Sequence, residues 1–381
     1  MSGGFTVAQR IAVLAVGVVG VLIPGLQPQL LGALAAEGRV SESLLGHVAT
    51  AELLAMGIAA GGAGFVLPIT RLRATAAAVI LLVAALDALT PGISGAALVA
   101  IRAVVGLGEG VLIWLAIGLI VRAAEPARWS GVYLAIQTLA QFAVATLLGL
   151  YVIPAAGSAG GFQALGIATV LGLIAVPWLP RRYAPLVRDD AANAAPIPAR
   201  GFMALAGVLV YLAFVVAVWV YVEPLARERA IPAGTIAVIA PLSLAMQVVG
   251  AGAATMLAGH VPALPTLVAV GAVNLLLLFV IGTPPSAGAF LAATSVFGFL
   301  WLFAMPFQVP AVIAADPSRR AAALIGGAQL VGSSLGPFTA ALLIGDGATG
   351  AVLWFGAASI IVAMLLLTVA ARRRRVQTLA L

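Results

Sequence analysis

Arg102 and Glu109 are two charged residues inside an apolar run that is long enough to cross a membrane. A charge at the centre of a lipid-embedded helix costs about 2.5–3.5 kcal/mol on insertion scales. On an α-helix this spacing puts the two side chains within about 20° of one face and about 10 Å apart along the axis. The shared face is therefore expected to point at another helix or at a water-filled path rather than at lipid.

Carboxyl groups within the apolar runs are candidates for carrying protons. A carboxyl group in a low-dielectric site can bind and release a proton near neutral pH, and Glu109 is the first candidate for this role. Glu52 is the alternative carrier, and Asp87 could assist. Asp87 lies at nearly the depth of Arg102, so the two could form an ion pair between neighbouring helices. Arg102 could instead be a fixed cation for an anionic solute, and each carboxyl group could be purely structural.

Neutral polar and aromatic side chains recur at helical spacing in the later apolar runs, as at Tyr133, Gln137 and Gln141. Donors and acceptors beside aromatic planes suit a small amphipathic or aromatic solute. For any one of these residues, interhelical hydrogen bonding is the alternative role. The predicted solute-binding set is Arg102, Tyr133, Gln137, Gln141, Tyr211, Trp219, Gln247, Trp301, Gln308, Gln329 and Ser333.

The elements that must position these residues are membrane-spanning helices. Of the 381 residues, 63% are hydrophobic and 8% charged, whereas soluble domains contain about 25% charged residues. Apolar runs of about 20 residues recur along the chain, which is typical of transmembrane helices. The predicted spans lie near 8–34, 43–67, 74–92, 95–123, 130–153, 162–180, 202–223, 234–257, 264–283, 287–313, 321–344 and 348–371.

Glycines and prolines in these spans predict close packing and breaks. Gly106 and Gly110 should allow a neighbouring helix to approach the helix that carries Arg102. The pair Pro24-Gly25, with Pro28, should interrupt span one. In the same way, Pro306 and Pro310 should interrupt span ten. Broken helices free backbone carbonyls and create bend points.

The distribution of arginine predicts the orientation of the chain. If both termini lie on one side, nearly all loop arginines lie there too, and only Arg39, Arg227 and Arg229 lie on the other side. The positive-inside rule then predicts a multi-pass inner-membrane protein with cytoplasmic N- and C-termini. Because these charges are spread over short loops, the net charge of +7 does not indicate nucleic-acid binding.

A repeated motif divides the chain into two halves. Ala124-Glu125-Pro126-Ala127-Arg128 follows span four, and Ala315-Asp316-Pro317-Ser318-Arg319 follows span ten, half a chain length later. The longest polar stretch lies between spans six and seven. The predicted organisation is an N-terminal six-helix bundle at 1–180, a cytoplasmic linker at 181–200, a C-terminal six-helix bundle at 201–371 and a basic cytoplasmic tail at 372–381.

Span four carries the clearest resemblance to a known family. Arg102, Gly106 and Gly110 have the Arg-x-x-x-Gly-x-x-x-Gly spacing that is often found there in the major facilitator superfamily, and Gly336-Pro337 in span eleven also resembles that family. The resemblance covers nearly the whole chain. It implies an all-α membrane protein with 12 transmembrane helices in two pseudo-symmetric six-helix bundles and a solute site between them. The segment 64–73 lacks the Asp of the family's gating motif.

Together these features predict a secondary active transporter rather than an enzyme. It would move a small organic solute, such as an organic anion or aromatic acid, by alternating access coupled to protons. Proton-driven efflux of amphipathic drugs is the alternative, and a membrane sensor or membrane enzyme is a third possibility. No metal, nucleotide or other cofactor is expected, because the chain has no Cys and no Gly-x-x-x-x-Gly-Lys motif. The expected partners are the solute, protons and the lipid bilayer, with the chain as a monomer.

Overall fold

The computed structural model describes residues 5–123, 126–184, 197–257, 259–283, 286–318, 320–345 and 348–371, without the side chains of 126–128, 130 and 323. Several sequence predictions therefore lie outside the described residues. They are Ala124, Glu125 and Arg319 of the repeated motif, residues 185–196 of the linker, and the tail at 372–381.

Helices make up the transmembrane part of the described chain. The first half contains α1 (Val7–Val19), α2 (Ile23–Ala36), α3 (Glu42–Val66), α4 (Leu72–Leu89), α5 (Gly95–Ile120), α6 (Pro126–Leu147) and α7 (Ile153–Leu171). The second half contains α8 (Ala199–Val220), α9 (Val222–Glu228), α10 (Ala233–Leu257), α11 (Ala263–Gly282), α12 (Ala287–Ala315), α13 (Arg320–Ala323), α14 (Ile325–Ile344) and α15 (Ala351–Ala371). Short π- and 3₁₀-helical turns cover Thr90–Gly92, Leu148–Val152 and Gly172–Trp178.

The number of spans agrees with the prediction of twelve. Among the described residues, 11 helical stretches are long and apolar enough to cross a membrane. One of them, Gly131–Trp178, has 48 residues, which corresponds to about 70 Å of helix, more than twice the thickness of a hydrocarbon core. Gly157 interrupts this stretch with a φ of 62°. The stretch therefore supplies two spans, α6 and α7.

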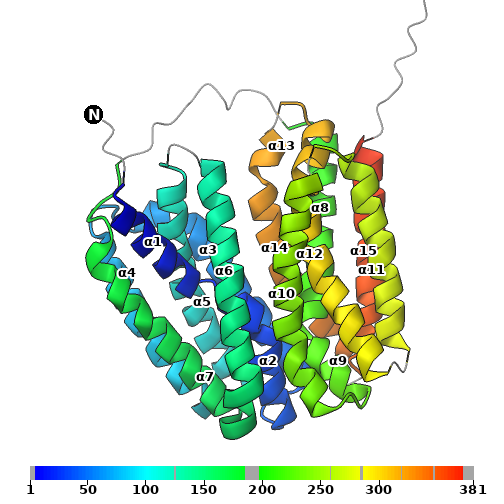
Figure 1. Cartoon of the computed structure of the whole chain (residues 1–381), viewed down its shortest axis with the longest axis horizontal. Helices are drawn as coiled ribbons and strands as arrows, with labels where there is room; N and C mark the ends of the chain where they lie inside the picture. The colour runs from blue at the N-terminus through cyan, green and yellow to red at the C-terminus, as the bar shows by residue number, and fades with distance from the viewer. Residues whose placement is uncertain are drawn as a thin grey trace, which may run out of the picture.

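The helices form two groups that stand side by side, α1–α7 in one and α8–α15 in the other (Figure 1). The start of α1 and the end of α15 lie at the same face of the molecule, which we call the terminal face. The short helix α9 lies at the other end of the bundle, which we call the opposite face (Figure 1).

Glycines bring α3 and α5 into backbone contact, as predicted for Gly106 and Gly110. A Cβ atom at Gly106 would collide with the carbonyl group of Glu52, and one at Gly110 would collide with that of Met56. Small residues permit this approach because they let two backbones meet without intervening side chains. The contact fixes α5, which carries Arg102, against α3.

Prolines act differently in the two spans where interruptions were predicted. Span one is broken just before Pro24, since α1 ends at Val19 and α2 begins at Ile23, but Pro28 lies inside the continuous helix α2 and does not interrupt it. In contrast, α12 is continuous from Ala287 to Ala315 through Pro306 and Pro310, so the predicted interruption of span ten is wrong. A proline removes one backbone N–H, and a helix packed against its neighbours can continue past that single loss.

Candidate functional site

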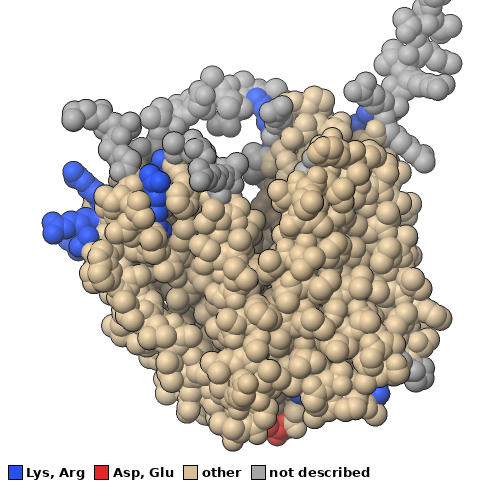
Figure 2. Space-filling model, viewed as in Figure 1, with Lys and Arg blue, Asp and Glu red and all other residues tan. Residues whose placement is uncertain are grey.

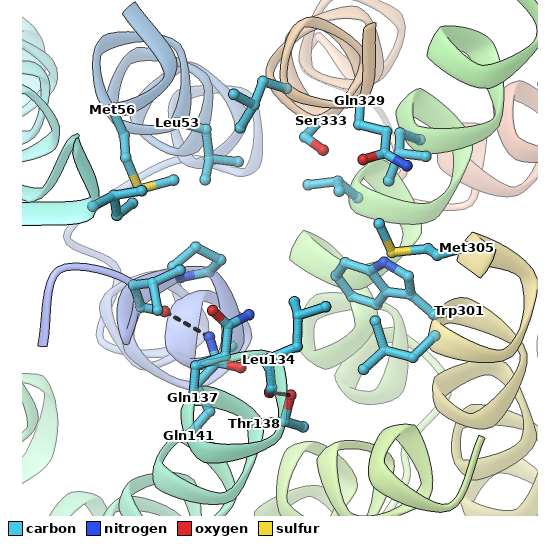
Figure 3. Close-up of a pocket in the computed structure, with 18 of the residues that line it drawn as sticks. Leu53, Met56, Leu134, Gln137, Thr138, Gln141, Trp301, Met305, Gln329 and Ser333 are labelled. Atoms are coloured by element: carbon cyan, nitrogen blue, oxygen red, sulfur yellow. Dashed lines mark hydrogen bonds between the residues drawn. The ribbon is translucent and has the colours of Figure 1, made fainter. Parts of the chain in front are cut away.

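A cavity of about 420 Å³ lies between the two groups of helices (Figure 3). Residues of α3, α5 and α6 line one side, residues of α8, α10, α12 and α14 line the other, and the segment around the α1–α2 break closes the wall. Apart from backbone groups, its hydrogen-bonding side chains are Tyr133, Gln137, Thr138, Gln141, Gln247, Trp301, Gln329 and Ser333. Leucine, isoleucine, valine and methionine supply most of the remaining lining.

The structure brings most of the predicted solute-binding residues to this cavity. The helical face of α6 supplies Tyr133, Gln137 and Gln141, whereas three other helices supply Gln247, Trp301, Gln329 and Ser333. Sequence reasoning missed the apolar members, such as Met56 and Met305, because apolar residues in an apolar helix carry no distinguishing signal. It also missed Thr138, which is next to Gln137 in the sequence.

Tyr211, Trp219 and Gln308 do not line the cavity, although they were predicted to. Tyr211 and Trp219 are buried on α8, which presents Leu212 and Val216 to the cavity instead. The predicted face of α8 therefore differs from the observed one, because α8 is enclosed by other helices and most of its sides are buried. Gln308 accepts a 2.9 Å hydrogen bond from the lining residue Gln329, so it lies behind the wall.

The lining amides differ in how they are held. The side chain of Gln141 donates a 2.6 Å hydrogen bond to the carbonyl oxygen of Val21, which lies in the break between α1 and α2 (Figure 3). The hydroxyl group of Tyr133 donates to Gly17 O at 2.9 Å. In contrast, Nε2 of Gln247 is buried without a hydrogen-bond partner among the described residues. The cavity wall therefore contains hydrogen-bonded amides together with one amide nitrogen that is buried without a partner among the described residues.

The cavity continues toward the terminal face. A second cavity of about 610 Å³ shares Ala60, Ile117, Gly326 and Leu330 with the first. It extends to Arg122, just beyond the end of α5. The space-filling view shows the surface hollowed between the two groups at this face (Figure 2). The halves are therefore parted on the terminal side.

At the opposite face the two halves are held together. Three side chains of the second half donate hydrogen bonds to backbone carbonyls of the first half, and we call them the closing bonds. They run from Trp219 to Pro24 at 2.8 Å, from Tyr221 to Glu42 at 2.9 Å and from Arg227 to Gly32 at 2.8 Å. The structure is thus open to one side and closed to the other.

Arg102 lies inside the first half, in a cluster of buried charges. Its guanidinium group donates to Asp87 Oδ1 at 2.6 Å, as the matching depths predicted, and it also forms an ion pair with Glu52. Thr90 accepts a further bond at 3.4 Å. The Arg102, Glu52 and Asp87 side chains are 0% to 1% exposed. Arg102 does not line the cavity in this conformation.

Glu109 belongs to the same region but lacks a charged partner in ion-pair contact among the described residues. It is 3% exposed, and its Oε2 atom is buried without a hydrogen bond to any residue that the structure describes. Gln27 of α2 is fully buried next to Glu52, and neither polar atom of its side chain has a hydrogen-bond partner within the part of the chain that the structure describes. Sequence reasoning missed Gln27, although a glutamine inside an apolar span was a usable signal. We call Arg102, Glu52, Asp87, Glu109 and Gln27 the buried charge cluster.

The buried charge cluster borders the closed end of the cavity. Glu109 precedes the lining residue Ile113 by one helical turn, about 6 Å along α5. On α3, Glu52 is followed directly by the lining residue Leu53. The α1–α2 break lies between the two sites, because Gly20 packs against the backbone of Glu109. Helices α3 and α5 therefore contribute side chains both to the cluster and to the cavity wall, but no side chain of the cluster lines the cavity.

Comparisons with known proteins connect this arrangement to transporters. No protein-family model matches the sequence, and a search of curated proteins gives no match. Among solved structures, a D-xylose-proton symporter has a TM-score of 0.67 and 16% identity, with 94% of this chain and 95% of that chain covered.

Two further structures are similar over nearly their whole lengths. The xylose transporter XylE from E. coli in a partially occluded inward-open conformation has a TM-score of 0.66 and 13% identity, with coverages of 94% and 96%. A mutant of the nucleoside transporter NupG has a TM-score of 0.68 and 10% identity, with coverages of 96% and 100%. With its two groups of helices and its central cavity, the chain shares the fold of these transporters, and its helical architecture is the one that the resemblance to the major facilitator superfamily implied.

Proposed function

We propose that this protein is a secondary active transporter that moves a small neutral organic solute by alternating access, coupled to protons. The observation that carries the proposal is the buried charge cluster at the closed end of an uncharged cavity between two helical groups. The names of the similar structures include a sugar–proton symporter and a nucleoside transporter, which supports this class of function.

The cavity lining favours a neutral solute over an anion. No Arg, Asp or Glu is among the described residues that line the 420 Å³ cavity. An anionic solute would need a cation, but the guanidinium group of Arg102 is enclosed by Asp87 and Glu52. Amide and hydroxyl groups around Trp301 can instead hydrogen-bond a neutral solute while the indole covers an apolar face. Efflux of amphipathic drugs remains the second candidate, because Met56 and Met305 give the wall adaptable apolar surface.

The charge balance of the cluster supports proton coupling. Three carboxyl groups lie near one guanidinium group, so full ionisation would bury two uncompensated negative charges. Burying unpaired charge is costly, and proton binding removes that cost. Arg102 holds Asp87 and Glu52, which leaves Glu109 as the proposed carrier with the other two assisting. Release of its proton requires access to water, which a change of conformation can supply.

The distribution of arginine supports an orientation with cytoplasmic termini in the inner membrane. The described residues Arg10, Arg71, Arg73 and Arg122 lie at the terminal face, and Figure 2 shows arginine gathered there. With this orientation, the terminal face is cytoplasmic and the opposite face is external. The structure then represents an inward-open conformation, closed to the outside by the closing bonds.

A two-stage experiment tests the proposal. Monosaccharides, nucleosides, benzoate and amphipathic amines are first screened by thermal shift, since a ligand of the folded state raises its apparent stability. Ligands that bind are then tested in proteoliposomes with an imposed pH gradient. We expect gradient-driven accumulation of a neutral ligand, abolished in Glu109→Gln but retained in Glu37→Gln, which changes a carboxyl group outside the cluster. Undiminished accumulation by Glu109→Gln would remove Glu109 from the mechanism. Preferential accumulation of benzoate would show that the solute is an anion, and preferential accumulation of amines would favour drug efflux.

A further inference from the structure

A further buried carboxyl group lies at the external closure, outside the buried charge cluster. Glu223 is on α9, beyond the Ala199–Val220 span, and it is 4% exposed. A Cβ atom at Gly32 of α2 would lie only 2.7 Å from Glu223 Oε2. The carboxyl group is therefore pressed against the backbone of the other half, at one of the three closing bonds.

Arg227 links this carboxyl group to the closing bond. One guanidinium nitrogen lies 3.1 Å from Glu223 Oε2, while another donates to Gly32 O at 2.8 Å. Glu223, Arg227 and Gly32 thus form one contact between α9 and α2. Separation of the halves at this face must break the Arg227–Gly32 bond and bring water to Glu223.

Few other charges face Glu223. Among the helices that pack against α9, neither α2 nor α10 contains a charged residue, and α8 contains only Arg200 at its distant terminal end. Glu42 of α3 interacts with Arg227 and with Glu228, but neither Glu42 nor Glu228 acts directly on Glu223. Arg229 pairs with Glu228 at 3.4 Å. The protonation of Glu223 therefore responds mainly to its burial and to Arg227.

We propose that Glu223 is a proton-binding site that adjusts external closure to the external pH, separate from the site of the transported proton. In the closed structure Glu223 is buried and does not line the cavity. Water therefore reaches its carboxyl group only when the external face opens. The cavity lining does not include Glu223, so this site exchanges protons with the external side alone. Protonation lets Glu223 be buried without charge, whereas ionisation favours its exposure.

The direction of the effect follows from the closed state. Burial raises the pKa of Glu223 to about 7, and the neighbouring Arg227 opposes this rise. When the face opens, the hydrated carboxyl group returns to the usual lower pKa of a glutamate. The closed form therefore binds more protons, so acidification from about pH 7 favours closure and alkaline pH favours opening. Between pH 8 and pH 5.5 the closed-to-open ratio should rise on the order of tenfold.

Distance measurements between spin labels test this site without any solute. The chain has no cysteine, so labels attach only where cysteines are introduced. Ala155→Cys and Ala233→Cys place exposed labels at the external ends of the two halves. Double electron–electron resonance in lipid nanodiscs would give the open and closed populations at pH 5.5 and pH 8.

The expected result is a closed-to-open ratio that falls on the order of tenfold from pH 5.5 to pH 8 in the labelled parent. Glu223→Gln should stay in the acid-like, closed distribution at both pH values, whereas Glu223→Asp should keep a pH response. Glu109→Gln should also keep the response, which distinguishes this site from the proposed carrier. A pH-independent parent, or an unchanged response in a folded Glu223→Gln protein, overturns the proposal. A response lost only in Glu109→Gln assigns the effect to the buried charge cluster and also overturns it.

Discussion

The indole N–H of Trp219 donates a 2.8 Å hydrogen bond to the carbonyl oxygen of Pro24, in the other half of the molecule. Pro24 belongs to the first turn of α2, directly after the break in span one. The Trp219 ring also meets the ring of Trp301 edge-on, with centroids 5.9 Å apart. One side chain therefore connects the closing bonds at the opposite face, the helix break and the wall of the cavity.

Trp219→Phe should weaken closure at the opposite face while retaining an aromatic ring beside Trp301. The substitution removes the N–H donor, and a net hydrogen bond contributes about 1 kcal/mol. We expect the closed-to-open ratio to fall about fivefold, measured with the spin-label pair at Ala155 and Ala233. Trp354→Phe is the matched control, because Trp354 is 81% exposed. A shift of the same size in both variants would contradict a specific role for Trp219.

Arg102→Gln should strongly destabilise the fold. Its removal leaves Asp87 and Glu52 buried without their cation, and breaking one partner of a buried pair costs about 3–5 kcal/mol. The free energy of unfolding in detergent measures this loss, and Arg181→Gln serves as an exposed control. Combining Arg102→Gln with Glu52→Gln and Asp87→Asn should recover stability but not proton-driven transport. Wild-type stability in the single variant would show that the ion pairs contribute little.

Gly110→Val should disrupt the packing of α3 on α5. A Cβ atom at this position already overlaps the backbone of Met56, and overpacking typically costs about 1–3 kcal/mol. The melting temperature and the yield of folded protein should both fall. Gly62→Val on α3 provides the comparison, since a Cβ atom there meets nothing within 4 Å. Equal losses in the two variants would mean that valine itself, rather than the α3–α5 contact, is responsible.

Gln137→Leu should weaken binding of the transported solute. Gln137 lines the cavity and can offer both a donor and an acceptor. Loss of its amide should raise the Kd about tenfold, corresponding to about 1.4 kcal/mol, as measured by isothermal titration with the ligand found in the screen. Thr146→Val lies on the same helix outside the cavity and should bind normally. An unaltered Kd in Gln137→Leu would place the solute elsewhere in the cavity.

Local features of the sequence were sufficient for much of the first half. The positions of Asp87 and Arg102 along their helices indicated equal depth, and the structure confirms their ion pair. Gly106 and Gly110 indicated close packing, which is also confirmed. These predictions succeeded because depth in a membrane and helix packing both follow from positions along one or two helices.

Features that depend on contacts between the halves could not be predicted in the same way. On α8, Tyr211 and Trp219 were predicted to face the cavity. That helix is packed against other helices on most sides, so the position of its aromatic residues does not indicate which side meets the cavity. The contact of Glu223 with Gly32 joins residues far apart in the sequence and exists only where the halves are closed. The sequence likewise could not show that the cavity lining is uncharged, because this depends on Arg102 being paired with Glu52 and Asp87 away from the cavity.

The uncharged cavity wall has an electrical consequence. If a neutral solute crosses together with one proton, the proton is the only charge translocated, so each cycle carries current. A membrane potential of 100 mV would then contribute about 2.3 kcal/mol per proton to the accumulation of solute, in addition to the pH gradient. The enclosure of Arg102 by its own carboxylates would thus let voltage, as well as acidity, drive transport of a molecule that itself has no charge.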